Sequence, residues 1–450
     1  MSADDGFNAI LQAIRPIAPF IRRAGIVVTG REKLSRMADK LEFVLITADA
    51  SENTVTEITR GVGCPQYRAL ASQHLAELFG LMNCRVAGFR KSSLAVQARQ
   101  ALSQYRISRH QPSDGKASPP WPMPPRHPRV AVLGASGIGR HHARWWKVDG
   151  ANVIAFLGST ASSLQHTADV LHQYLGGQQP PRGYTDLEKL LESEHPDIVD
   201  ICLPPEMHCQ AAKAALAHGV HTIIEKPFLF DATLSPEALL AQADELVGLA
   251  ASQHRMLGMT SQYFGQTRYC RGLRENPEKP VECLKMELFT VQRHHSADPR
   301  DTWIDLGPHL LAAAQGVSDG RIPDAGSLQA AVDDACTRVS FDCVGNDLPP
   351  LHCELACGRL PNAPDATNHR LLELDGCRID CQGCRDHEGN FQMNLRRLHT
   401  TDSHFHADFM RTLLKSFGNG RIVIDGATAK INLEWLLRIA ELIPKEGNHE

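Results

Sequence analysis

The sequence predicts an α/β protein with three folded parts: a small α/β/α sandwich, a doubly wound parallel sheet, and an α/β domain with an open, mostly antiparallel sheet. Three observations support this prediction. At 450 residues the chain is longer than one hydrophobic core usually organises. A proline-rich segment interrupts it after the first quarter. Beyond that segment, short apolar runs alternate with helical stretches, as they do in parallel sheets.

Composition excludes several classes of protein. With 42% apolar and 22% charged residues, the chain is neither largely disordered nor fibrous. No apolar run approaches the ~18 residues of a membrane span, and the opening MSADDGF lacks the layout of a signal peptide. The 13 cysteines are an odd number scattered over a long chain, which suits reduced thiols. We therefore expect a cytoplasmic protein with no membrane partner.

The front part, residues 1–107, is predicted to be the small sandwich. Apolar runs at 25–28, 43–46 and 86–89 alternate with helical stretches. Residues 1–110 hold 15 Lys and Arg against 9 Asp and Glu, whereas the remainder holds 32 against 42. This basic front is the part expected to meet a polyanion.

Residues 108–128 read SRHQPSDGKASPPWPMPPRHP, with seven prolines and no periodicity, and predict an extended, semi-rigid linker. Over 129–233, the runs PRVAVLG, ANVIAFLG, DIVDICLPP and HTIIEKP separated by helices predict the parallel sheet. Over 234–450, VECLKMELFTV and HRLLELDGCRIDCQG predict antiparallel strands, and INLEWLLRIAELI predicts a closing amphipathic helix.

A glycine-rich turn directly follows the first of these parallel strands. PRVAVL runs into Gly134, Ala135, Ser136, Gly137, Ile138 and Gly139 and then into a helix, the order that a dinucleotide-binding Rossmann domain requires. Glycines let the backbone approach a pyrophosphate, and the helix start favours its charge. The sequence therefore predicts that Gly134, Ser136, Gly137, Ile138 and Gly139 bind the cofactor. The alternative is a turn that only packs helix against strand.

The next strand ends at the position where the adenosine ribose is expected. An NAD site normally places Asp or Glu there, but this chain has Gly158, Ser159 and Thr160. Because hydroxyls can receive a 2′-phosphate and no carboxylate repels it, the sequence favours NADP(H), with NAD(H) as the alternative.

Two later strands place further candidates at the same sheet edge. One ends in Leu203, Pro204, Pro205, Glu206, Met207 and His208, and the other in Glu225, Lys226 and Pro227. Ligands of doubly wound sheets bind at this carboxyl edge. We therefore count Leu203, Pro204, His208, Glu225 and Lys226 among the cofactor-binding residues.

A third candidate segment follows the first strand of the last domain. It reads WIDLGPH, in which Asp305 and His309 share one face if the segment is helical. Lysine, aspartate and histidine together can bind a substrate hydroxyl and take its proton while hydride leaves the same carbon. Lys226, Asp305 and His309 are the predicted catalytic residues.

These motifs, IGRHHA, DIVDICLPPEMH, GVHTIIEKPF and a distant D-x-G-x-H, resemble the Gfo/Idh/MocA family of oxidoreductases over residues ~129–445. The resemblance implies NAD(P)-dependent hydride transfer on a hydroxyl-bearing carbon of a sugar, polyol or related small molecule. In the family, the lysine contacts substrate and nicotinamide and the histidine acts as acid or base. The resemblance also implies that the protein forms a homo-dimer or homo-tetramer through its C-terminal sheet.

Departures from the family pattern leave alternatives open. Ser136 replaces a glycine, Leu203 stands where many members have a polar residue, and Asp301, Thr302 and Trp303 stand where a glycine cluster is usual. A redox-assisted NAD-dependent glycosidase is one alternative. A non-catalytic nucleotide-sensing protein is another.

The front part resembles the small ribosomal-protein family that recognises kink-turns in RNA. The match rests on IRRAGIVVTGREKLSRM, LEFVLITADASENTVTEI, SQHLAELFG and VAGFRKSSLA. It implies an RNA-facing loop and helix start at Gly30, Arg31, Glu32, Lys33 and Arg36, with structured RNA as a partner of residues 1–110. Arg31 replaces the usual asparagine. The alternative is an ordinary solvated basic face.

Cys377, Cys381 and Cys384 superficially offer ligands for zinc or an iron–sulfur cluster. Because they lie in a strand–turn–strand pattern, alternation instead predicts Cys377 and Cys381 as small core residues. We predict no metal. Of His294 and His295, at most one is expected to face the cleft.

Overall fold

The computed structural model describes residues 8–50, 54, 58, 64–82, 84–102, 121–176, 179–292, 298–333, 336–363, 365–387 and 391–444. It forms two compact units, Met1–Lys116 and Ala117–Glu450. The domain boundaries at 107, 128 and 233 stay predictions. Most of the predicted linker, up to residue 120, lies outside the described residues, as do His294 and His295.

The first unit is built on a four-stranded sheet of order β1-β4-β2-β3, in which only β2 and β3 run parallel. Its strands are β1 (Val27–Val28), β2 (Leu41–Ile46), β3 (Gln66–Arg68) and β4 (Val86–Arg90). Its helices are α1 (Asn8–Ile14), α2 (Ala18–Arg23), α3 (Arg31–Arg36), η2 (Ala38–Lys40), α5 (Ser72–Phe79) and α6 (Ser93–Ala101).

Both faces of this sheet are buried, which makes it the middle layer of a sandwich. Along β2, Phe43 and Leu45 belong to one apolar core, whereas Val44 and Ile46 belong to another. Phe43 stacks on Phe89 at 4.4 Å between ring centroids. Since side chains of a strand alternate between faces, these two cores lie on opposite sides of the sheet.

The second unit begins with a six-stranded, all-parallel sheet of order β10-β9-β8-β5-β6-β7. The strands are β5 (Arg129–Leu133), β6 (Asn152–Leu157), β7 (Arg182–Tyr184), β8 (Ile198–Ile201), β9 (His221–Ile224) and β10 (Leu257–Met259). The helices are α7 (Ile138–Val148), α8 (Ala161–Leu175), α9 (Leu187–Glu194), η4 (Pro205–Met207), α10 (His208–Ala217) and α11 (Pro236–Ser252). Chain order reverses between β5 and β8, where doubly wound sheets bind ligands.

A separate nine-stranded sheet follows, with the order β12-β14-β15-β11-β16-β17-β18-β19, and β13 pairs with β14. All its strand pairs except β11–β15 are antiparallel. The strands are β11 (Cys283–Val291), β12 (Ile322–Pro323), β13 (Gln329–Asp333), β14 (Cys336–Val344), β15 (Leu351–Leu360), β16 (His369–Leu374), β17 (Cys377–Arg385), β18 (Phe391–Arg397) and β19 (Ser403–Ala407). The predicted fold class is therefore confirmed.

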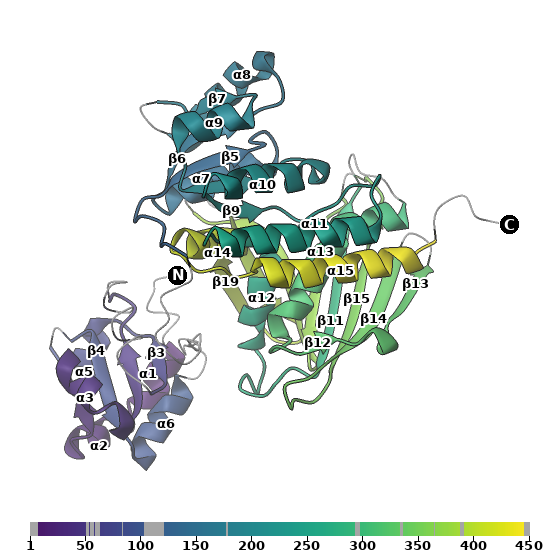
Figure 1. The fold of residues 1–450 in the computed structure, drawn as a ribbon. Coiled ribbons are helices and arrows are strands. Elements are labelled where there is room, and N and C mark those ends of the chain that lie inside the picture. Colours follow the sequence, from purple (N-terminus) through teal and green to yellow (C-terminus); the bar gives the residue numbers. More distant parts are fainter. Residues whose placement is uncertain are drawn as a thin grey trace. The chain divides into compact units, whose positions relative to one another are not determined.

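Helices cover one face of the nine-stranded sheet (Figure 1). They are α12 (Gln262–Arg271), α13 (Pro299–Val317), α14 (Phe409–Gly418) and α15 (Gly426–Leu442); the short η5 (Ala325–Ser327) lies between strands. Leu284, Met286 and Leu288 of β11 are buried on the covered face, and the residues between them are half-exposed. Helix α13 brings Asp305 and His309 over this sheet. No helix within the described ranges is long and apolar enough to cross a membrane.

An ion pair ties the parallel sheet's first helix to the helices of the second sheet. Arg411 on α14 donates from Nε and Nη2 to the carboxylate of Asp149, which follows α7, at 2.9 Å each. The Asp149 side chain is only 7% exposed. This two-point geometry fixes the orientation of α14 against α7.

Replacing Arg411 by Ala is expected to lower the free energy of unfolding by about 1–3 kcal/mol, because a shielded carboxylate loses charged hydrogen bonds. Urea unfolding followed by tryptophan fluorescence measures this unit alone, since all five tryptophans lie between residues 121 and 435. The matched control is Arg438→Ala, whose i,i+4 pair with Glu434 is exposed and worth about 0.5 kcal/mol or less. Equal losses in the two variants would contradict the prediction.

Candidate active site

The glycine turn between β5 and α7 leaves open space where a dinucleotide would pass. A Cβ on Gly134, which has a φ of 86°, would lie 2.5 Å from the carbonyl oxygen of Cys202, and one on Gly139 would lie 2.3 Å from that of Gly134. A Cβ on Gly137 would meet nothing within 4 Å. Ser136 and Ile138 are exposed beside it. The turn therefore fits a pyrophosphate, whose charge the first N–H groups of α7 favour.

Hydroxyl groups gather at the end of β6, as predicted. Ser159 and Thr160 are exposed, and Thr160 is the N-cap residue of α8. The Oγ1 of Thr160 lies 3.0 Å from the Oγ of Ser163 and 3.2 Å from that of Ser162. Gly158 is required for packing, because a Cβ there would lie 2.8 Å from Leu164.

Among the candidates at the end of β8, Leu203 is half-buried and Pro204 is exposed, but His208 is fully buried. The Nε2 of His208 lies 2.8 Å from the carbonyl oxygen of Leu203, and its Nδ1 lies 3.1 Å from that of Pro227. Burial lowers the pKa of His208, and a neutral ring donates to only one of these carbonyls. His208 therefore holds the loops after β8 and β9 together.

A buried polar cluster connects the glycine-turn helix to Lys226. His142 on α7 donates from Nδ1 to Asp200 at 2.9 Å, and the indole of Trp146 donates to the same carboxylate at 2.7 Å. The Nε2 of His142 lies 4.0 Å from Glu225, whose carboxylate accepts the backbone N–H of Lys226. The carboxylate of Glu225 is thus buried between His142 and the backbone of Lys226.

Burial and neighbouring charges shift the pKa values of the groups in this cluster. Burial alone would lower the pKa of His142, but the neighbouring carboxylate of Asp200 outweighs it and raises that pKa. Burial raises the pKa of Glu225 and, more strongly, that of the Cys202 thiol. The carboxylate of Asp200 therefore favours the protonated form of His142, and both side chains are fully buried.

Lys226 forms an ion pair with Asp305 across the two sheets. The Nζ of Lys226 lies 2.6 Å from Oδ1 of Asp305 and 3.0 Å from its carbonyl oxygen. Arg359 on β15 binds the other carboxylate oxygen of Asp305 and also donates to Thr290 on β11. Asp305 therefore sits between two cations, one from each sheet.

The electrostatics leave Asp305 charged and His309 neutral. Burial alone would raise the pKa of Asp305, but Lys226 and Arg359 outweigh it and hold that pKa below its usual range. Burial and then the charge of Lys226 hold the pKa of His309 well below its usual range. A neutral imidazole can accept a proton at physiological pH.

Ser261, the N-cap residue of α12, and Tyr263 in its first turn lie against His309. The Nδ1 of His309 lies 3.0 Å from the hydroxyl oxygen of Ser261, and its ring lies 5.0 Å from that of Tyr263 between centroids. Sequence reasoning missed Ser261, Tyr263 and Arg359. Ser261 and Tyr263 follow the buried Thr260 by one and three residues, so their place just after a strand could have identified them. No sequence pattern around Arg359 identifies it as a site residue.

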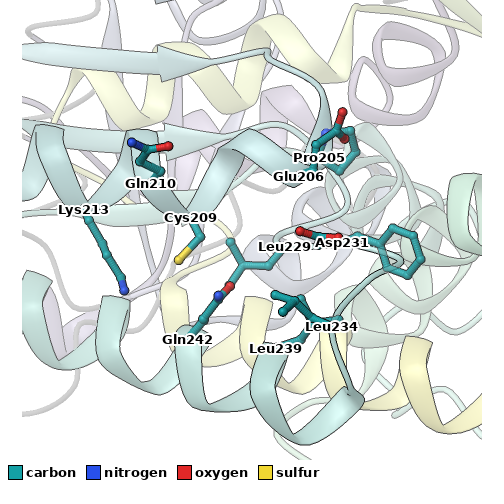
Figure 2. A pocket seen from close by; sticks show the side chains of 11 residues that line it. Pro205, Glu206, Cys209, Gln210, Lys213, Leu229, Asp231, Leu234, Leu239 and Gln242 are labelled. Carbon is teal, nitrogen blue, oxygen red and sulfur yellow. The ribbon is translucent and has the colours of Figure 1, made fainter.

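A cavity of 270 Å³ lies between α10, α11 and the segment after β9 (Figure 2). It is lined by Pro205, Glu206, Cys209, Gln210, Lys213, Leu229, Phe230, Asp231, Leu234, Leu239 and Gln242. None of the sequence-predicted site residues is in this lining.

In the first unit, Gly30 is exposed with a φ of 94° directly before α3, and Lys33 and Arg36 of α3 are exposed. The side chains of Arg31 and Glu32 lie outside the described residues.

Two cysteines on β17 were expected to be core residues. Cys381 is buried and Cys377 is half-buried. Within the described ranges, the three groups close enough to share a metal are His142, Asp200 and Cys202. Hydrogen bonds already occupy the Asp200 carboxylate and His142 Nδ1.

The part of the chain that forms the parallel sheet is similar to known proteins. Residues 128–261 match the model of the Gfo/Idh/MocA family, described as an oxidoreductase family with an NAD-binding Rossmann fold. The chain is 29% identical over 185 residues to UDP-N-acetylglucosamine 3-dehydrogenase of Acidithiobacillus ferrooxidans, covering 38% of this chain and 53% of that one.

A second relative is 4-carboxy-2-hydroxymuconate-6-semialdehyde dehydrogenase of a Sphingobium species, 27% identical over 187 residues, covering 41% of this chain and 54% of that one. The chain thus matches about half the length of these curated relatives. A solved structure of the Acidithiobacillus enzyme has a TM-score of 0.53 at 20% identity, covering 70% of this chain and 98% of its own. It supports the fold of both sheets. The similarity to the Gfo/Idh/MocA family model thus covers residues 128–261, which are 134 of the 450 residues of the chain.

Proposed function

We propose that the protein is an NAD(P)-dependent dehydrogenase that moves hydride between nicotinamide and a hydroxyl-bearing carbon of a sugar, polyol or related small molecule. The observation that supports this most is the ion pair of Lys226 with Asp305 beside a neutral His309. It lies at the carboxyl edge of a sheet whose glycine turn fits a dinucleotide.

The residues divide the chemistry between them. Gly134, Gly137 and Gly139 would hold the pyrophosphate, and the bound nicotinamide would accept or return the hydride. His309 accepts the proton of the substrate hydroxyl at Nε2, because its Nδ1 already contacts Ser261. Lys226 donates a hydrogen bond to the same oxygen, and Asp305 holds its ammonium group in place.

Within this proposal the cofactor is NADP(H) in preference to NAD(H). Ser159, Thr160, Ser162 and Ser163 offer hydroxyls at the start of α8, and the sequence has no carboxylate at the end of β6. In NAD sites a carboxylate at this position holds the ribose 2′-hydroxyl, and this chain has none there.

Titration of the full chain is expected to show saturable binding of NADPH, tighter than that of NADH, when nucleotide fluorescence is followed. Thr160→Asp should raise the Kd for NADPH about tenfold or more, because the new carboxylate repels the 2′-phosphate. NADH should then bind more tightly than NADPH. Ser252→Asp, at the far end of α11, is the control. No binding of either nucleotide would overturn the proposed function, and tighter binding of NADH would overturn only the preference.

The names of the two relatives guide the substrate panel: one acts on a nucleotide sugar and the other on a carboxylated semialdehyde. With the best member of a panel of sugars, polyols, their acids and UDP-N-acetylglucosamine, Lys226→Ala or His309→Ala should each lower turnover by roughly 10²-fold or more. Cofactor affinity should stay near normal. Lys189→Ala, an exposed lysine on α9, is the control.

The pH profile supplies a second readout for His309. Because its pKa is lowered, the imidazole loses its proton-accepting form only below the ~6.5 of a free histidine. The acid limb of substrate oxidation in the wild type should therefore lie below that pH.

Unchanged turnover in both alanine variants would make the assignment of Lys226 and His309 as catalytic residues untenable. Steady accumulation of reduced cofactor separates a dehydrogenase from a redox-assisted glycosidase.

For the first unit we propose contact with structured RNA through Gly30, Arg31, Glu32, Lys33 and Arg36. Lys33 and Arg36 are exposed on α3. Binding of a kink-turn hairpin to the full chain should weaken with salt, and Lys33→Ala with Arg36→Ala should reduce the salt slope by about two. Lys285→Ala, on the second sheet, is the control. Equal affinity for plain duplex RNA would remove this proposal.

A homo-dimer or homo-tetramer through the C-terminal sheet also stays a proposal. The face of that sheet opposite the helices carries half-exposed side chains of β11, among them Lys285 and Glu287. A monomer in sedimentation of the full chain would overturn it.

A further inference from the structure

Two arginines project from the helix-covered face of the second sheet, close to the proposed active site. β11 lies between β15 and β16, with Thr290 opposite Arg359 and Leu288 opposite Arg370. Residues directly opposite each other in a sheet project from the same face, and Leu288 is 1% exposed beneath the helices. From strand spacing, the Cα atoms of Arg359 and Arg370 are about 12 Å apart.

The two arginines differ in how their charge is balanced. Arg359 binds the carboxylate of Asp305. Arg370 has no carboxylate within 4.0 Å in the part of the chain that the structure describes. Its Nε is buried and makes no hydrogen bond. Arg370 as a whole is half-buried, so its guanidinium can meet an incoming anion, and that anion would supply the counter-charge that is missing nearby.

Arg370 borders the residues assigned to proton transfer. Its guanidinium interacts with the hydroxyl of Tyr263, whose ring lies 5.0 Å from that of His309. The charge of Arg370 also reaches Asp408, which accepts the backbone N–H of Met410 at 2.8 Å and whose pKa burial raises to about 6. Asp408 is mostly charged at neutral pH, but no ion pair within 4.0 Å joins it to Arg370 among the described residues.

We propose that Arg370 binds an anionic group of the substrate, a carboxylate or a phosphate, and so selects acidic sugars or related hydroxy acids over neutral ones. This inference rests on the proposed function. The planar guanidinium matches both anions in two-point geometry, and Tyr263 and His309 fix its distance from the reacting hydroxyl. Arg370 is thus a specificity-determining residue, whereas Arg359 is committed to Asp305.

The test uses the full chain saturated with NADP⁺ or NAD⁺ and matched probes. Glucose is compared with glucuronate and glucose 6-phosphate, and galactose with galacturonate, by cofactor reduction and by calorimetric titration. At least one acidic member is expected to bind tenfold or more tightly than its neutral partner. The uronates and the sugar phosphate separate carboxylate from phosphate recognition.

At the pH optimum, Arg370→Gln should raise the KM and Kd for that acidic probe at least tenfold with little change in kcat, and should change the KM and Kd for the neutral partner far less. Arg370→Lys should restore part of the affinity. Arg396→Gln, an exposed arginine on β18 paired with Asp380, is the matched control.

A shift in the pH profile separates a charge effect from a loss of folding. The charged groups around His309 are Lys226, Asp305 and Arg370, and Arg370 is one of the two that lower its pKa. In Arg370→Gln the acid limb of kcat/KM should therefore move to higher pH.

Two outcomes overturn the inference. One is a panel in which no acidic member binds better than its neutral partner, and the other is an Arg370→Gln variant that keeps the preference. If the same preparation binds the nicotinamide nucleotide and reduces it with a neutral member of the panel, either outcome leaves the proposed function in place. A chain that binds no nicotinamide nucleotide overturns both.

Discussion

The arrangement depends on one carboxylate, that of Asp305. It is held by Lys226, from the loop that ends β9 of the parallel sheet, and by Arg359, from the middle of the second sheet. Two cations around one anion set both the position and the ionisation of the group. Burial, and after it the positive charge of Lys226, keeps the neighbouring imidazole of His309 uncharged.

Much of this could be predicted from the sequence, because local patterns specify local structure. The glycine turn, the strand before it and the helix after it are adjacent in the chain, so their order predicts the Rossmann domain. Asp305 and His309 lie four residues apart on α13, a separation that helical periodicity places on one face.

The rest depends on long-range register that no local pattern carries. Arg359 and Arg370 reach the site only because β15 and β16 both pair with β11. The strands β7 and β10 have three residues each, too short to give a periodic signal. Glu225 and His208 stay predicted cofactor-binding residues, but the sequence does not reveal that both are buried, one beside His142 and the other against backbone carbonyls. A motif identifies which residues matter, but the packing decides which way they point.

The separation of roles between the two sheets has an evolutionary consequence. Strand β16 pairs with β11 and β17 alone, and all three lie outside the sheet that carries the glycine turn. Substitutions along β16 can therefore change what the second sheet accepts without disturbing the first. Lineages descended from such a chain could diversify in what they recognise through changes on a single strand, while the sheet that carries the glycine turn stayed under constant selection.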